Sequence, residues 1–160
     1  MAFNNRIVLI TLVVIIGCGR AHPSDDGGPI RTQLNALAQE LQAGRIGMVE
    51  ILQISSSSIF RTQVTPELME KWWDYKSTIR HIDGSPRDKV VAALKSAVTQ
   101  QGDPRPDIRW GIVFYSAQEQ KRIGALYFDG PGRNGFVNDL PASFKDGLLH
   151  NLSAVLFDRP

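Results

Sequence analysis

The side chains of this sequence that could carry out acid–base chemistry are few and far apart. Three histidines occur: His22, His81 and His150. Hydrolysis by a carboxylate and an imidazole requires both groups to meet in a pocket. Glu50 is the acid of greatest interest, because it stands alone in an aliphatic segment; it either has a partner there or faces solvent at a sheet edge. One hypothesis is therefore a small hydrolase whose reactive groups come from these residues: Glu50, Asp83, Asp129 and His81.

The linear motifs of familiar catalytic, phosphate and metal sites are absent from the sequence. Neither the nucleophile elbow Gly-x-Ser-x-Gly nor the zinc motif His-Glu-x-x-His occurs. Residues 129–135 are rich in glycine, but Pro131 removes an amide and no lysine follows, so the segment is typical of a turn. A single cysteine cannot build a site that needs several thiolates. We therefore expect no catalytic residue, no cofactor and no metal site.

The single cysteine, Cys18, follows the features of a secretory signal. Arg6 precedes an apolar segment, residues 7–16, and Gly17 stands directly before the cysteine. A bilayer span needs about 20 apolar residues, so this segment is too short for a transmembrane helix. A signal cut by the ordinary signal peptidase is a second alternative, and the bulky Ile15 disfavours it. A buried structural cysteine is a third, and a position so near an exported N-terminus disfavours it.

The residues Ile15-Ile16-Gly17-Cys18 resemble the lipobox of the bacterial lipoproteins. The resemblance implies that residues 1–17 are removed as a signal peptide, that the thiol of Cys18 is diacylated, and that its new amine is acylated in turn. Two or more acyl chains hold a protein stably at a bilayer, so the lipid bilayer is the first expected partner. Gly19 differs from the aspartate that often retains lipoproteins at the inner membrane, which implies an outer-membrane location facing the periplasm.

Composition divides the rest of the sequence into a tether and one domain. Residues 18–29 are rich in Gly, Pro, Ser and Asp, and they predict a flexible tether. Residues 30–158 have the length of one globular domain, and the overall content of 42% hydrophobic and 21% charged residues is ordinary for such a domain. Lysine and arginine do not cluster with interleaved aromatic residues, so we expect no nucleic-acid partner.

Hydrophobic periodicity predicts the fold class. Three segments have the aliphatic content or the alternation of strands: 46–54, 108–115 and 122–128. Two shorter strands are expected at 77–82 and 136–137. The short polar link between 108–115 and 122–128 predicts an antiparallel hairpin. Four segments predict helices, from apolar stripes at helical spacing or from capping signals: 29–43, the stretch after Thr65-Pro66, 86–98, and the stretch after Asp139 or Ser143. We therefore predict a single α+β domain in which a mainly antiparallel sheet of about four to five strands packs with three to four helices.

Trp72, Trp73 and Tyr75 form the group most suggestive of binding. On a helix that starts at Thr65, the two tryptophans would point about 100° apart, so both can be buried only under a wide contact. Burial in the core is one interpretation. The other is an exposed patch, because tryptophan and tyrosine are enriched in binding hot spots.

The absence of reactive motifs favours a function without chemistry. We predict a membrane-anchored envelope lipoprotein that acts as a non-enzymatic binding or inhibitory module for a protein or another envelope component. Trp72, Trp73 and Tyr75 are the candidate partner-binding residues. A small envelope hydrolase that uses acidic residues with His81 remains the alternative function.

Acylation of Cys18 is the first testable prediction. Cys18→Ser removes the thiol, which is the nucleophile that receives the lipid. The variant precursor should therefore stay unacylated and uncleaved by the lipoprotein peptidase, as mass spectrometry of both N-termini would show. A mature wild-type chain that begins without lipid at any other residue would contradict the prediction.

Overall fold

Three antiparallel strands form the centre of the fold in the computed structural model, which describes residues 28–157. β1 (Ile46–Gln53) pairs with β4 (Ile108–Ser116), and β4 pairs with β5 (Arg122–Asp129). The ends of these strands agree with the three predicted segments to within one residue, and β4 and β5 form the predicted hairpin. Aliphatic and aromatic residues on alternate positions make these strands, because the side chains of a strand point to opposite faces in turn.

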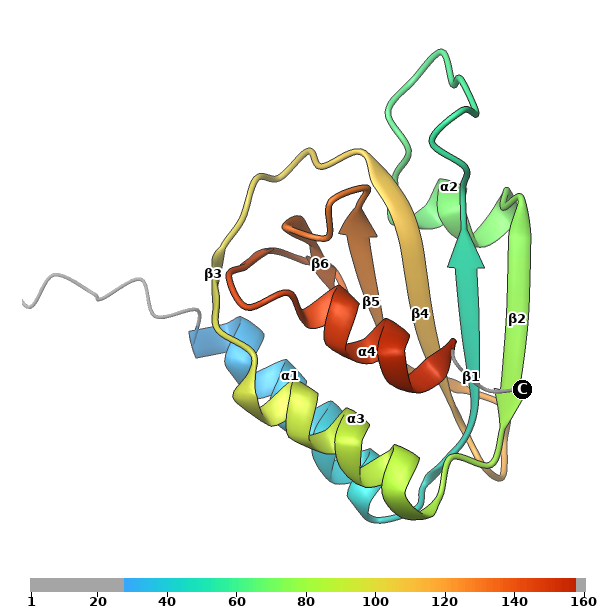
Figure 1. Ribbon diagram of the computed structural model, residues 1–160, viewed down its shortest axis with the longest axis vertical. Helices are drawn as coiled ribbons and strands as arrows, with labels where there is room; N and C mark the ends of the chain where they lie inside the picture. The colour runs from blue at the N-terminus through green and yellow to red at the C-terminus, as the bar shows by residue number, and fades with distance from the viewer. Residues whose placement is uncertain (1–27, 158–160) are drawn as a thin grey trace, which may run out of the picture.

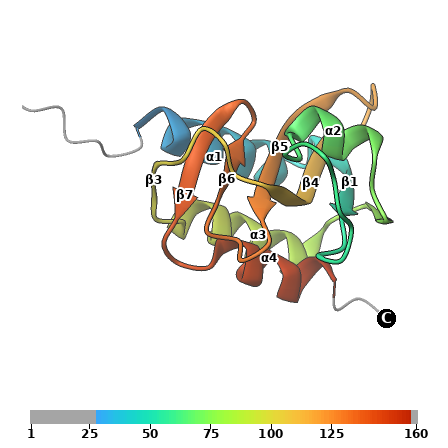
Figure 2. The same cartoon turned by 90° about the horizontal axis from the view of Figure 1, so that it is seen from above.

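Four shorter strands complete a seven-stranded antiparallel sheet with the order β2-β1-β4-β5-β6-β7-β3 (Figures 1 and 2). They are β2 (Tyr75–Arg80), β3 (Thr99–Gln101), β6 (Asn134–Val137) and β7 (Leu140–Phe144). The α+β class and the antiparallel sheet are confirmed, whereas the predicted number of four to five strands is wrong. β3 has three polar residues and β7 contains a proline, so neither carries the pattern from which strands are predicted.

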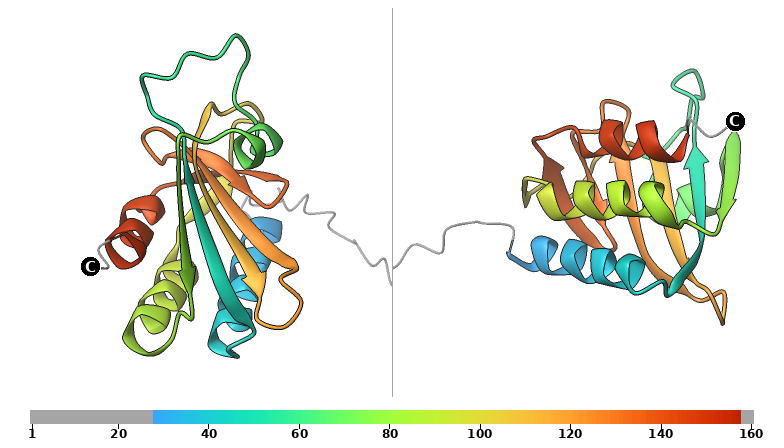
Figure 3. Two further views of the ribbon diagram at one scale, coloured as in Figure 1. Left: turned by 90° about the vertical axis from the view of Figure 1, so that its right-hand side faces the viewer. Right: turned by 60° about the horizontal axis from the view of Figure 1, so that its bottom comes forward.

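Three helices cover one face of the sheet. α1 (Gly28–Gln42), α3 (Gly84–Ser96) and α4 (Leu148–Leu156) turn their apolar stripes toward it, and Figure 3 shows α3 and α4 on the same side of the strands. The main core lies between these helices and one set of alternating strand residues, among them Val49, Ile51, Ile112, Phe114, Leu126 and Phe128. The number of helices in the described residues is four and agrees with the predicted three to four.

The other face of the sheet has much less cover. It carries one short helix, α2 (Pro66–Lys71), and the loop 54–65, which stand together in the left panel of Figure 3. A smaller core lies beneath them, formed mainly by Leu52, Ile54, Val64, Met69, Val113 and Tyr127. The sheet is therefore buried unequally on its two faces.

Two helix boundaries differ from the sequence prediction. α3 ends at Ser96, so Val98, predicted on its buried stripe, is 52% exposed. α4 begins at Leu148, after Gly147, because residues 140–144 pair with β6 as strand β7. The predicted start at Asp139 or Ser143 is therefore wrong, and tertiary pairing has overridden a local capping signal.

The predicted signal peptide, Cys18, His22 and residues 18–27 of the predicted tether lie outside the described residues, as does residue 158. α1 begins at Gly28, so the last two positions of the predicted tether belong to a helix. None of the helices in residues 28–157 has the length and hydropathy needed to cross a membrane.

Core truncation tests the assignment of the main hydrophobic face. Leu94 of α3 and Ile112 of β4 are both fully buried, so Leu94→Ala and Ile112→Ala should each lower the free energy of unfolding by about 2–5 kcal/mol. Val98→Ala is the matched control and should change it little, because Val98 is about half exposed. Denaturant unfolding measures all three, and an unchanged midpoint in either core variant would contradict the assignment.

Candidate functional site

The segment that follows α2 exposes both tryptophans. Thr65 caps α2 by accepting a hydrogen bond from the Leu68 N–H at 3.3 Å, and the helix ends at Lys71. Trp72 already has an extended backbone (φ −131°, ψ 111°), so the chain leaves the helix before the two aromatic side chains. Trp72 and Trp73 are 64% and 44% exposed. Of the two interpretations, burial in the core is wrong and the exposed patch describes the structure.

Asp74 holds this segment beside the loop that precedes α2. Its Oδ2 accepts hydrogen bonds from the Ser58 hydroxyl at 2.6 Å and the Ser55 N–H at 2.8 Å, and its own N–H donates to the Gln53 carbonyl at 2.9 Å. The Ser58 hydroxyl, followed by the Ser55 amide, lowers the pKa of Asp74, because both donors favour the charged carboxylate. Arg109 Nη1 donates to the carbonyls of the same two serines at 3.0 Å each. Hydrogen bonds therefore fix the position of the segment 72–75. Its exposed residues Trp72, Trp73 and Tyr75 are called the aromatic corner below.

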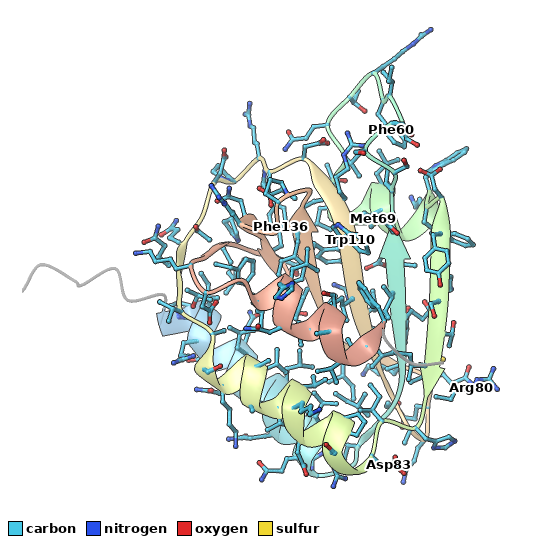
Figure 4. All side chains as sticks on the ribbon, in the orientation of Figure 1. Phe60, Met69, Arg80, Asp83, Trp110 and Phe136 are labelled. Carbon is cyan, nitrogen blue, oxygen red and sulfur yellow. The ribbon has the colours of Figure 1, made fainter. Side chains whose placement is uncertain are left out.

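Tyr75 begins β2 and lines a groove on the helix-covered face of the sheet. The groove has a volume of about 430 Å³ and lies between β2 and the end of α4. Tyr75, Trp110 and Phe157 are its aromatic residues, and the rings of the last two stack with their centroids 5.4 Å apart. Arg80 lines the groove near the other end of β2, and Figure 4 shows its side chain projecting away from the sheet.

The opposite face of β2 carries a charged network. The Nζ of Lys76 lies 2.6 Å from a carboxylate oxygen of Glu50 and 5.7 Å from the centroid of the Trp73 ring. Glu50 also accepts a hydrogen bond from the Tyr115 hydroxyl at 3.1 Å. One carboxylate on β1 therefore joins a cation on β2 to a phenol on β4. This position explains a lone acid in an aliphatic strand: Glu50 has partners and ties three strands together on the less covered face.

A second carboxylate–tyrosine pair on the same face joins α2 to β5. Glu70 accepts a hydrogen bond from the Tyr127 hydroxyl and forms an ion pair with Arg122 at 3.0 Å. Burial, followed by the hydrogen bond to Glu70, raises the pKa of Tyr127. Burial, followed by the hydrogen bond to Glu50, raises the pKa of Tyr115 to about 12. Both phenols therefore remain hydrogen-bond donors at neutral pH, which suits them to holding the sheet together and not to proton transfer.

The four residues proposed for a hydrolase do not meet at one place. The N–H of His81 bonds to the chain at the start of β1, whereas Asp129 pairs with Ile108 at the start of β4. Because β1 and β4 are antiparallel, these two residues lie at opposite ends of the sheet. Asp83 precedes α3 and makes no side-chain capping bond. Glu50 already accepts a hydrogen bond from Tyr115 on the less covered face of the sheet. Within residues 28–157, no group of three His, Cys, Asp or Glu side chains is placed to hold a metal ion.

Most of the groove was missed by reasoning from the sequence. Tyr75 belongs to the predicted aromatic group, but Trp110 and Phe157 were not singled out. Trp110 is visible in the sequence as one of the alternating apolar positions of β4. Its contact with Phe157 depends on the direction in which α4 crosses the sheet, and no local pattern encodes that direction.

Comparison of the chain with protein-family models, with curated proteins and with solved structures finds no match. The function of the site is therefore inferred from its own geometry.

The Tyr115–Glu50 contact makes a prediction at alkaline pH. Burial, followed by the hydrogen bond to Glu50, raises the pKa of Tyr115 in the folded protein from its ordinary value of 10.0 to about 12. The neutral phenol therefore contributes its full stabilisation of the fold below pH 10, and this contribution is lost as the pH rises through about 12. The absorbance of the phenolate in wild type, minus that in Tyr115→Phe, should show a midpoint near pH 12. Glu50→Gln should lower this midpoint, because it removes the negative charge. A wild-type midpoint near 10 would contradict the burial of the Tyr115 phenol and its hydrogen bond to Glu50.

Proposed function

We propose that this protein is a membrane-anchored envelope lipoprotein that binds a protein partner and performs no chemistry of its own. The observation that carries the proposal is the exposure of Trp72, Trp73 and Tyr75 on a corner that Asp74 holds in place. Large aromatic side chains are costly to leave in water, and in exposed clusters they are typical of interaction sites. A fixed corner also lowers the entropy that is lost on binding.

The position of this corner also fits an anchored protein. α1 begins at Gly28 and packs near β3, β6 and β7, which form the side of the sheet opposite to β2 (Figure 1). The lipobox resemblance implies an anchor at Cys18, before α1 in the chain. A tether that reaches the domain at α1 would be attached on the side of the domain far from the aromatic corner. This arrangement supports a surface that is open to a periplasmic partner, either a target that the protein inhibits or a component that it holds.

The hydrolase alternative has no observation in its favour. His81 and Asp129 lie at opposite ends of the sheet, and the carboxylate of Glu50 already has a lysine and a tyrosine as partners. A catalytic acid and base must lie within hydrogen-bond reach of one substrate position. The separation of these groups therefore supports binding over catalysis.

Site-specific crosslinking in living cells tests the proposal. A photoreactive amino acid in place of Trp72 should capture one defined partner, whereas the same amino acid at Gln39, exposed on α1, should not. With the purified partner, Trp72→Ala should weaken binding by about 2 kcal/mol, or roughly 30-fold, as the loss of a hot-spot side chain does. Equal capture at the two positions, or turnover of a cell-envelope substrate that His81→Ala abolishes in a folded protein, would contradict the proposal.

A further inference from the structure

β2 is one of the two edge strands of the sheet, so half of its backbone groups have no strand to pair with among the described residues. In an antiparallel pair, opposite residues alternate between hydrogen-bonded and non-bonded positions. Arg80 lies opposite Met48, and the next pair along is bonded, because the His81 N–H donates to the Gly47 carbonyl at 3.0 Å. The odd-numbered residues of β2 therefore bond to β1.

The other side of β1 gives the same result independently. The Ile54 N–H donates to the Arg109 carbonyl at 2.9 Å, and this bond is in register with the pairing of Glu50 and Val113. The even-numbered residues of β1 thus bond to β4, which leaves its odd-numbered residues for β2. It follows that three residues of β2 direct their N–H and C=O groups away from the sheet: Lys76, Thr78 and Arg80.

This open edge runs beside the aromatic groove. The odd-numbered residues Tyr75, Ser77 and Ile79 turn their side chains toward the helix-covered face and line the groove with Trp110 and Phe157. An extended chain that paired with β2 would point every second side chain to that same face. The groove is therefore placed to receive apolar side chains from such a chain, in the mode in which a peptide adds a strand to a sheet edge.

The charges on β2 indicate which side chains a strand paired with its open edge would carry. Lys76 already has a carboxylate partner in Glu50, whereas Arg80 forms no ion pair within residues 28–157. An acidic side chain directly across from Arg80 would complete a cross-strand pair. Two copies of β2 that pair about Thr78 would instead place Lys76 opposite Arg80 of the other copy, and like charges in that position repel.

We infer that the partner binds as an extended segment that adds a β-strand to the open edge of β2, with an apolar or aromatic side chain in the groove and an acidic side chain across from Arg80. This inference rests on the proposed function and names how the partner is recognised. Backbone hydrogen bonds from Lys76, Thr78 and Arg80 supply affinity, and the groove and the arginine supply specificity.

The variant Thr78→Pro distinguishes strand addition at the β2 edge from binding that does not use the β2 backbone. Thr78 lies at a non-bonded position opposite Glu50, so Thr78→Pro removes an outward N–H without breaking a bond to β1, and a proline is tolerated at such a place on an edge strand. Thr78→Ser keeps the N–H and is the matched control. Arg80→Glu tests the charge and does not alter the backbone.

The probe is a random library of peptides about twelve residues long, selected against the purified full-length chain. Selected peptides should combine acidic and large apolar residues, bind Thr78→Ser like the wild type, and bind Thr78→Pro about tenfold more weakly or worse, because a main-chain donor is lost. Replacing the acidic residue of the peptide by lysine should weaken binding to the wild type and restore binding to Arg80→Glu. Circular dichroism and thermal melts confirm that each variant is folded.

Three results would overturn the inference. These are a selection that enriches no binding peptide, selected peptides that bind Thr78→Pro and Arg80→Glu as tightly as the wild type, and a β2-dependent dimer of the chain in size-exclusion chromatography with light scattering. Crosslinking at Trp72 distinguishes this failure from failure of the proposed function. If crosslinking at Trp72 captures a partner and Thr78→Pro does not weaken the binding of that partner, the proposed binding function stands and strand addition at β2 is wrong.

Discussion

Unequal cover of the two faces of the sheet is the constraint on which the rest of the structure depends. Three helices bury one face under a continuous core, whereas the other face has only a six-residue helix and a loop. Strands on a poorly covered face need other means of cohesion. Here two carboxylates supply it, because each one accepts a hydrogen bond from a tyrosine and forms an ion pair with a cation. Glu50 bonds to Tyr115 and Lys76, and Glu70 bonds to Tyr127 and Arg122.

The position of β2 at one edge of the sheet explains its character. One side of its backbone therefore has no partner strand among the described residues, and a groove lies between it and the end of α4 on the helix-covered face. Edge strands are normally protected by charged side chains, and Lys76 and Arg80 are such residues. Lys76, however, is neutralised by Glu50. Arg80 is the cation that remains. Together with the aromatic corner, it favours pairing with an acidic strand over pairing with any exposed strand.

The sequence was informative wherever local pattern and tertiary packing agreed. The alternation in 108–115, the polar link after it and the stripe of leucines in α1 predicted the central hairpin and a packed helix correctly. Prediction failed where long-range pairing decides the outcome. β3 is defined by β7 and not by its own three polar residues, and α4 starts late because β7 takes the residues before it. The aromatic corner was found from composition, but its exposure depends on the early end of α2. The open edge and the groove depend on the strand order, which no local pattern specifies.

Amide hydrogen exchange measured residue by residue, with and without a bound partner segment, tests the central claim most directly. In the free protein, the N–H groups of Lys76, Thr78 and Arg80 should exchange quickly, while those of Ser77, Ile79 and His81 are protected by β1. Binding should slow exchange at the three even-numbered positions and leave the odd-numbered ones unchanged. Slow exchange at all six positions in the free protein, or protection on binding confined to α2 and the loop before it, would contradict a partner strand at the β2 edge.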